Sequence, residues 1–152
     1  MDAVIFRVAQ SADLPAIVAL LADDMLSVAR EAPGDAGYAA AFAAIEADPH
    51  ETLVVAECDG VVAGCLQLGF IPGLSRRGAW RGQIEGVRVA AALRGRGVGR
   101  AIILWAVEQC RARGCATVQL TTDKRRHDAH RFYESLGFIR SHEGLKLSLE
   151  TA

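Results

Sequence analysis

Residues 87–100 read VRVAAALRGRGVGR and lead from a strand-like run into a glycine-rich turn. The run before them, QIEGVRV (83–89), predicts a strand, and an apolar helical run follows from about Gly97 to Arg113. The first N–H groups of a helix have no partner within the helix, and that end is electropositive. Glycines let an anion approach those groups closely. Three glycines and three arginines at one strand-to-helix junction therefore indicate a turn that binds a diphosphate.

Other nucleotide-binding turns match this stretch less well. The chain has no GxxxxGK[ST], which excludes a P-loop. A dinucleotide-binding turn would explain the glycines, and Asp123 would then be the downstream acid that bonds the ribose. However, AAALR separates the strand from the first glycine, and too few residues follow for the remaining strand–helix units. A plain glycine turn flanked by solvated arginines stays as the alternative.

The order of predicted elements indicates an α/β fold. Asp59-Gly60 joins two strand-like runs and is a strong signal of a hairpin. Gly114 is expected to end the helix that precedes it. We predict a single domain (1–152) with a mixed, mostly antiparallel sheet of six to seven strands flanked by about four helices. The expected strands are 4–9, 52–58, 61–70, 83–89, 115–122 and two within 138–149, and the helices are about 11–25, 38–47, 97–113 and 128–136.

Bulk composition excludes several classes of protein. The formal net charge of −1 gives no overall field that would attract nucleic acid or an anionic membrane. The first residues, MDAVIFRVAQSADL, contain no long apolar stretch, so we expect neither a signal peptide nor a membrane span. We therefore expect a cytoplasmic protein. The four cysteines form no CxxC pair and are expected to be buried, reduced thiols. A homodimer is compatible with this sequence.

Two motifs resemble a known superfamily. Arg94-x-x-Gly97-x-Gly99 and AHRFYESLGF (129–138) resemble the motifs of the GCN5-related N-acetyltransferase (GNAT) superfamily. The stretch KRRHDAHRFY (124–133) is most similar to aminoalkylphosphonate-type small-molecule N-acetyltransferases. The resemblance implies acetyl-CoA as cosubstrate. Many members carry Asn where this chain has Arg126, three residues before Ala129. The residues expected to bind the coenzyme are Val87, Arg88, Val89, Arg94, Gly95, Arg96, Gly97, Val98, Gly99, Arg100, Arg126 and Ala129.

The strand before the turn supplies the candidate base. Alternate residues of a strand face one side, so Gln83 and Glu85 are expected to share a face with Val87 and Val89. The resemblance implies that the backbone of these two valines hydrogen-bonds the pantetheine and the thioester oxygen, which is oxyanion-type stabilisation. An alkylammonium has a pKa of ~10 and must lose a proton before attack. We expect Glu85, the only carboxylate of the strand, to act as general base, directly or through water; a surface or paired carboxylate is the alternative.

Tyr133 occupies the tyrosine position of the closing motif. There the resemblance implies that its hydroxyl faces the coenzyme sulfur. A thiol pKa of ~8.5 against ~10 for a phenol makes full proton transfer to the thiolate uphill. We therefore expect Tyr133 to assist thiolate departure first as a hydrogen-bond donor. The alternative is a core aromatic residue packed with Phe132.

His127 and His130 are three residues apart, a spacing that can bind metal, and the phosphonate-acetylating relatives are associated with divalent metal. No third ligand is apparent, so solvated or capping roles are favoured and no metal site is predicted. Asp128 is interpreted as a carboxylate at the helix N-terminus.

The acceptor side gives conflicting signals. In this superfamily acceptor specificity usually comes from the first two helices and the loop before the motif strand. Acids on the helical side would favour a cationic amine, whereas arginines in the 71–82 loop would favour an acceptor that also carries an anionic group. The residues concerned are Asp23, Asp24, Glu31 and Tyr38 on the helical side, and Arg76, Arg77, Trp80 and Arg81 in the loop.

The sequence therefore predicts an acetyl-CoA-dependent enzyme that acetylates a small-molecule primary amine. Two alternatives stay open: an acetyltransferase of protein N-termini or lysines, and an acetyl-CoA-binding sensor module without turnover.

Overall fold

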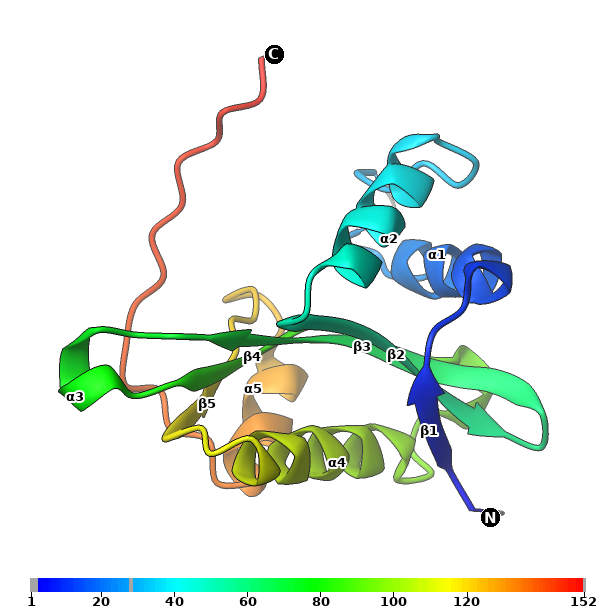
Figure 1. The fold of residues 1–152 in the computed structure, drawn as a ribbon. Helices are drawn as coiled ribbons and strands as arrows, with labels where there is room; N and C mark the ends of the chain where they lie inside the picture. The colour runs from blue at the N-terminus through cyan, green and yellow to red at the C-terminus, as the bar shows by residue number, and fades with distance from the viewer. Residues whose placement is uncertain (1–2, 28, 152) are drawn as a thin grey trace. The chain divides into compact units, whose positions relative to one another are not determined.

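The computed structural model describes residues 3–27 and 29–151. The chain divides into two compact units, Met1–Leu120 and Thr121–Ala152. The first unit contains the β-sheet and helices α1 to α4, and the second contains α5 and the C-terminal tail (Figure 1).

The sheet of the first unit is mixed and mostly antiparallel, as the sequence predicts. Within the described ranges it has five strands in the order β1-β2-β3-β4-β5, and only the β4–β5 pair is parallel. Asp59 (φ 51°) and Gly60 (φ 75°) form the expected tight turn between β2 and β3. The strands are β1 (Ile5–Val8), β2 (Glu51–Cys58), β3 (Val61–Ile71), β4 (Arg81–Val89) and β5 (Thr117–Gln119).

Helices cover both faces of this sheet (Figure 1). On one face α1 (Leu14–Ala22), which follows the short η1 turn (Ser11–Asp13), packs with α2 (Gly37–Ala47). The core there includes Ala9, Ile17, Phe42, Val55 and Cys65.

On the other face lies α4 (Val98–Ala112), which buries Ile102, Ile103 and Cys110. A Cβ at Gly82 of the sheet would overlap the Cys110 side chain of α4, and a Cβ at Gly64 would overlap both Ile102 of α4 and the Arg88 carbonyl of β4. The sheet therefore separates an α1–α2 face from an α4 face.

The end of α4 follows the local signal. Gly114 has φ 80°, its N–H donates to the Arg111 carbonyl at 3.0 Å, and the Cys115 N–H donates to the Cys110 carbonyl at 3.0 Å. This pattern is the one that glycine at a helix C-terminus provides.

The C-terminal part departs from the prediction. Helix α5 (His127–Ser135) is present, but the two strands expected within 138–149 are not, and β5 is shorter than the expected 115–122. Leu145, Leu147 and Leu149 are 86–95% exposed. Alternating leucines favour a strand, but a strand also needs a neighbour to pair with, and the described residues provide none here. The expectation of six to seven strands was therefore wrong.

None of the helices in the described ranges has the length and apolarity that crossing a bilayer requires. The four cysteines are free; Cys58, Cys65 and Cys110 are buried and Cys115 is half-buried.

Candidate functional site

The glycine turn (residues 94–99) lies between β4 and α4, as the motif predicts. A short turn of 3-10 helix, η2 (Ala91–Leu93), precedes it. Gly95 and Gly97 have φ values of 76° and 84°, a conformation that glycine adopts without strain. A Cβ on either glycine would meet no described atom within 4 Å. The backbone of the turn is therefore open to a ligand.

The N-terminus of α4 faces this opening with its own donors. Gly97 is the N-cap residue, and no side chain in the described part of the chain caps it. The first intrahelical bond runs from the Ala101 N–H to the Gly97 carbonyl at 3.0 Å. The N–H groups of residues 98–100 thus have no acceptor inside the helix. Together with the helix dipole they form an anion site that fits a diphosphate.

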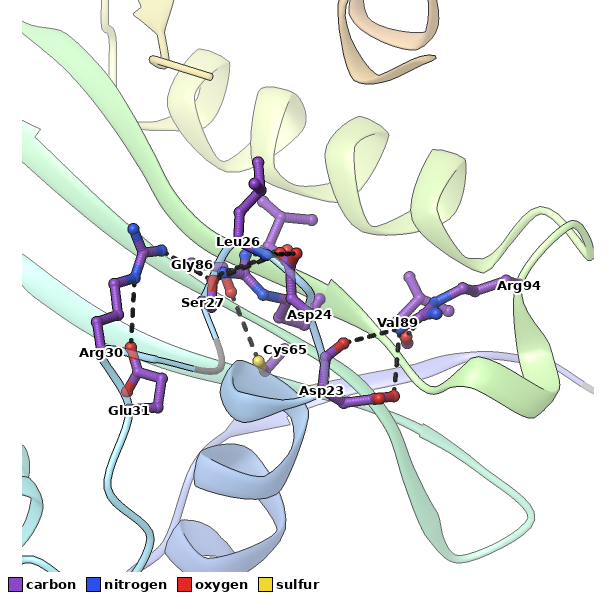
Figure 2. A network of polar contacts seen from close by, with 12 residues as sticks. Asp23, Asp24, Leu26, Ser27, Arg30, Glu31, Cys65, Gly86, Val89 and Arg94 are labelled. Carbon is purple, nitrogen blue, oxygen red and sulfur yellow. Dashed lines mark hydrogen bonds and ion pairs between the residues drawn. The ribbon is translucent and has the colours of Figure 1, made fainter. Parts of the chain in front are cut away.

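The three arginines of the turn are placed differently. Arg96 and Arg100 are exposed. Arg94 donates from Nε to the Val89 carbonyl at 3.2 Å, and from Nη2 to both the backbone carbonyl and the carboxylate of Asp23 at 3.3 Å (Figure 2). Arg94 thereby connects the turn to the end of α1.

Strand β4 contains a bulge that alternation along QIEGVRV (83–89) does not predict. Glu85 pairs with Gln67 and Arg88 pairs with Cys65, so two residues of β4 lie opposite the single residue between them in β3. Gly86, in the bulge, has φ 59°. An extra residue in one strand breaks the alternation of side chains along it.

The bulge corrects the predicted orientation of Glu85. Glu85 pairs with Gln67, and Arg88 pairs with Cys65. Gln67 and Cys65 are two residues apart in β3 and lie on its α1–α2 face, so Glu85 and Arg88 share that face. Val89 pairs with Gly64, which faces α4. The expectation that Glu85 and Val89 share one face was therefore wrong, because it assumed an unbroken strand.

The outer edge of β4 is paired with a described strand only at its first residues. Strand β5 pairs only with Arg81–Gln83, and Gln119 Nε2 donates to Gln83 Oε1 at 2.7 Å. Among the described strands, none pairs with the remaining edge of β4, which includes Val87 and Val89. Backbone groups along this edge can therefore bind an extended ligand by hydrogen bonds.

The side chain of Arg88 lies under the connection between α1 and α2 (the acceptor-side segment, residues 23–31, of which residue 28 is not described). Its Nη2 donates to Ser27 Oγ at 3.1 Å and lies 3.8 Å from Asp24 Oδ2. Ser27 is fully buried, and Arg88 Nε is buried without a partner among the described atoms. The side chain of Arg88 therefore supports this segment, and sequence reasoning missed Ser27 because an isolated serine carries no pattern.

The acids predicted to bind an amine already have partners of their own. Arg30 Nη2 donates to Ser27 Oγ at 2.9 Å, and Arg30 lies 3.7 Å from Glu31. The Tyr38 hydroxyl donates to Glu31 at 2.7 Å, which raises the pKa of Tyr38. Asp23 is likewise paired with Arg94. These acids are therefore less available to an ammonium group.

The bulge also adjoins a buried thiol. Cys65 Sγ lies 3.6 Å from the Gly86 carbonyl, and burial raises the pKa of Cys65 to about 11. This thiol is protonated at neutral pH and is not a nucleophile there.

The loop between β3 and β4 presents its arginines outward. Its short helix α3 (Ser75–Gly78) has Arg76 and Arg77 at φ 55° and 61°, and both are exposed. Trp80 is half-buried, and its ring lies 5.2 Å from that of His50.

In the second unit, Ala129 and Tyr133 lie on α5, and Arg126 is the residue before its first turn. The Tyr133 ring packs edge-on against Phe132 and Phe138 at 5.1 and 5.7 Å. Arg126 precedes the helix, and its N–H donates to the Asp123 carbonyl at 3.0 Å.

The residues around α5 also include the histidine pair considered for metal. His130 Nε2 lies 3.0 Å from the Asp123 carbonyl oxygen. Hydrogen bonds from Arg125 hold the pKa of Asp123 well below its usual range. Asp128 forms an ion pair with Arg131. Across residues 3–27 and 29–151, no group of three or more His, Cys, Asp and Glu side chains could hold a metal ion.

Comparison with known proteins identifies a family that matches most of the chain. The model of the Acetyltransferase (GNAT) family matches residues 14–138. A crystal structure of a transcriptional regulator from Bacillus halodurans C-125 is 45% identical, covers 97% of this chain and 100% of that one, and has a TM-score of 0.94.

Two curated relatives are enzymes. An aminoalkylphosphonate N-acetyltransferase from Salmonella typhimurium is 35% identical over 66% of this chain and 65% of that protein. A glucosamine 6-phosphate N-acetyltransferase from Trypanosoma brucei brucei is 38% identical over 55% of this chain and 54% of that protein. The chain thus spans less than two thirds of either relative.

Proposed function

The chain belongs to the GNAT acetyltransferase family, and on that premise we propose that it transfers the acetyl group of acetyl-CoA to a primary amine of a small molecule. The observation that carries this proposal is the open glycine turn at the uncapped N-terminus of α4, next to the free edge of β4. The family match crosses from the first unit into the second, which supports one acetyltransferase domain over 1–152.

The coenzyme would bind along these two features. The diphosphate would accept hydrogen bonds from the N–H groups of residues 98–100, and Arg96 and Arg100 would add positive charge. The pantetheine arm would run along the edge of β4 and bond the backbone at Val87 and Val89. Arg88 would contribute through its backbone, because its side chain faces Ser27. Arg126 and Ala129 are the proposed contacts from α5.

The proposed chemistry is direct attack of the amine nitrogen on the thioester carbonyl. Glu85 or a water beside it first takes one proton from the ammonium. The neutral nitrogen then forms the C–N bond as the C–S bond breaks, the electron pair leaves on the coenzyme sulfur, and the second proton of the nitrogen goes to that thiolate. Glu85 is exposed and shares its sheet face with α1 and α2, so solvent and an acceptor can reach it. Tyr133 would donate a hydrogen bond to the departing thiolate.

The acceptor class is supported by the relatives. The names of both curated relatives identify an amine that carries a phosphonate or a phosphate, and both are small molecules. The pairing of Asp23, Asp24 and Glu31 with basic or hydroxyl partners argues against an acceptor-side segment specialised for polycations. Acetylation of protein N-termini or lysines is the alternative within the same chemistry.

A second candidate function has one observation in its favour. The 45% identical structure from Bacillus halodurans is described as a transcriptional regulator. A protein of that kind could bind acetyl-CoA as a signal without turning it over. The two functions differ in whether thiol is released from acetyl-CoA.

An amine panel distinguishes these functions. Release of the CoA thiol is followed with aminoalkylphosphonates, amino sugars, amino acids, polyamines and peptides, while calorimetry measures acetyl-CoA binding. Turnover of a small amine supports the enzyme. Binding of acetyl-CoA with no turnover on any amine would remove the enzymatic proposal and favour the regulator.

Two variants test the residue roles. Glu85→Gln should lower kcat/KM most at low pH, where the acceptor is protonated, and Glu150→Gln, at an exposed position in the tail, is the control. A Glu85→Gln profile that matches wild type at every pH removes the base assignment. Tyr133→Phe should lower kcat by about 10²- to 10⁴-fold if it assists the leaving thiolate. An undiminished kcat excludes that role.

A further inference from the structure

Arg94 belongs to the glycine turn, yet its guanidinium is occupied by the end of α1 (Figure 2). We infer that Asp23 competes with the coenzyme diphosphate for Arg94 and thereby sets the affinity for the coenzyme. This inference rests on the proposed function, because it requires that a diphosphate binds at the glycine turn.

The contacts occupy one of the two edges of Arg94 that can bind a phosphate. Nε donates to the Val89 carbonyl at 3.2 Å, and Nη2 donates to the Asp23 carbonyl and carboxylate at 3.3 Å. Nε and Nη2 form one of the two edges with which a guanidinium grips two oxygens of an anion. A bidentate phosphate on this edge must therefore replace the Val89 carbonyl and both acceptors of Asp23, its backbone carbonyl and its carboxylate.

The pair between Arg94 and Asp23 is weak enough to exchange. The Arg94 side chain is 54% exposed and the Asp23 side chain is 59% exposed. Ion pairs of this exposure are screened by solvent and contribute little. A diphosphate offers more negative charge and also bonds the N–H groups at the start of α4. Because the carboxylate and the diphosphate are both anions, they repel each other if they share the guanidinium.

Release of Asp23 leaves the acceptor-side segment attached. The next contacts along it are Asp24 and Ser27 with Arg88, whose side chains are mostly buried, and Leu26 N–H, which donates to Asp24 Oδ1 at 3.0 Å. The exchange therefore involves Arg94 with Asp23 and the Val89 carbonyl, and leaves the contacts of Asp24 and Ser27 in place. Asp23 acts as a positioning residue, since it touches neither partner of the proposed acetyl transfer.

The test is the affinity of the full chain for three probes, measured by calorimetry. Coenzyme A and ADP both carry a diphosphate, whereas pantetheine does not. Asp23→Asn should bind coenzyme A and ADP about two- to fivefold more tightly than wild type, the range that an exposed ion pair supplies. Pantetheine affinity should not change, and the gain should shrink as ionic strength rises.

Two further variants make the result specific. Asp59→Asn removes the same charge from the turn between β2 and β3, where φ 51° suits asparagine, and should leave all affinities unchanged. In an Arg94→Gln background, Asp23→Asn should no longer tighten coenzyme A binding. Equal or weaker binding of coenzyme A by Asp23→Asn, or the same gain with Asp59→Asn, overturns the inference alone. A wild-type chain that binds neither coenzyme A nor ADP overturns the proposed function and the inference together.

Discussion

Replacing Gly86 by alanine tests whether the bulge in β4 is a requirement of the fold. Gly86 has φ 59°, and a Cβ there would lie 3.8 Å from Leu21 Cδ2, an ordinary contact. The cost is therefore backbone strain and not a clash. A left-handed conformation costs an L-residue roughly 1–2 kcal/mol, and alanine recovers only ~0.4–1 kcal/mol by restricting the unfolded chain. We expect Gly86→Ala to lower the free energy of unfolding by about 1 kcal/mol.

The chain cannot escape this strain by removing the bulge. Losing the extra residue would shift the register of one half of β4 by one position, which would move either buried Ile84 or Val89 from the α4 face to the α1–α2 face. Urea denaturation measures the change. Gly86→Asn should cost less than Gly86→Ala because asparagine tolerates this conformation, and Gly144→Ala, in open space, is the neutral control. If Gly86→Ala is as stable as wild type, or Gly86→Asn is no better than Gly86→Ala, the reasoning is refuted.

Three other outcomes are expected. Gly82→Ala should destabilise the fold by about 1–3 kcal/mol because its Cβ overlaps Cys110 Sγ, and Cys110→Ala in the same chain should restore part of that loss; additive losses in a denaturation cycle would contradict this. Because burial raises the pKa of Cys65 to about 11, peptide mass spectrometry should find its alkylation at pH 8 only after denaturant is added, and rapid labelling of native protein would contradict its burial. Hydrogen bonds from Arg7 hold the pKa of Asp13 below its ordinary value, so this carboxylate stabilises the fold above pH ~4 and loses its effect as pH falls through the lowered pKa. The difference in Tm between wild type and Asp13→Asn should therefore shrink from pH 6 to pH 3, and a constant difference would exclude this linkage.

Features that arise within a few residues were predictable from the sequence. Asp59-Gly60 specifies a tight hairpin turn because both residues can adopt positive φ, and Gly114 ends α4 for the same reason. The glycine turn was predictable too, because the free N–H groups belong to α4 itself.

The orientation of Glu85 was not predictable in this way. Alternation along QIEGVRV predicts one face for residues 83 to 89, but pairing with β3 places an extra residue beside Gly86. A glycine inside a strand pattern can mark a bulge. Only the pairing with β3 shows where the register shifts, because in the bulge two residues of β4 lie opposite one residue of β3.

The sequence by itself determined the position of the glycine turn, the hairpin and the helix ends, since each depends on φ preferences and hydrogen-bonding groups of neighbouring residues. The tertiary structure decided three things that depend on distant partners. It placed Glu85 and Arg88 on one face, it joined Arg94 to Asp23, and it left Leu145–Leu149 outside any described strand. Residues far apart in the chain meet only when the sheet and helices pack, so no local pattern records those contacts.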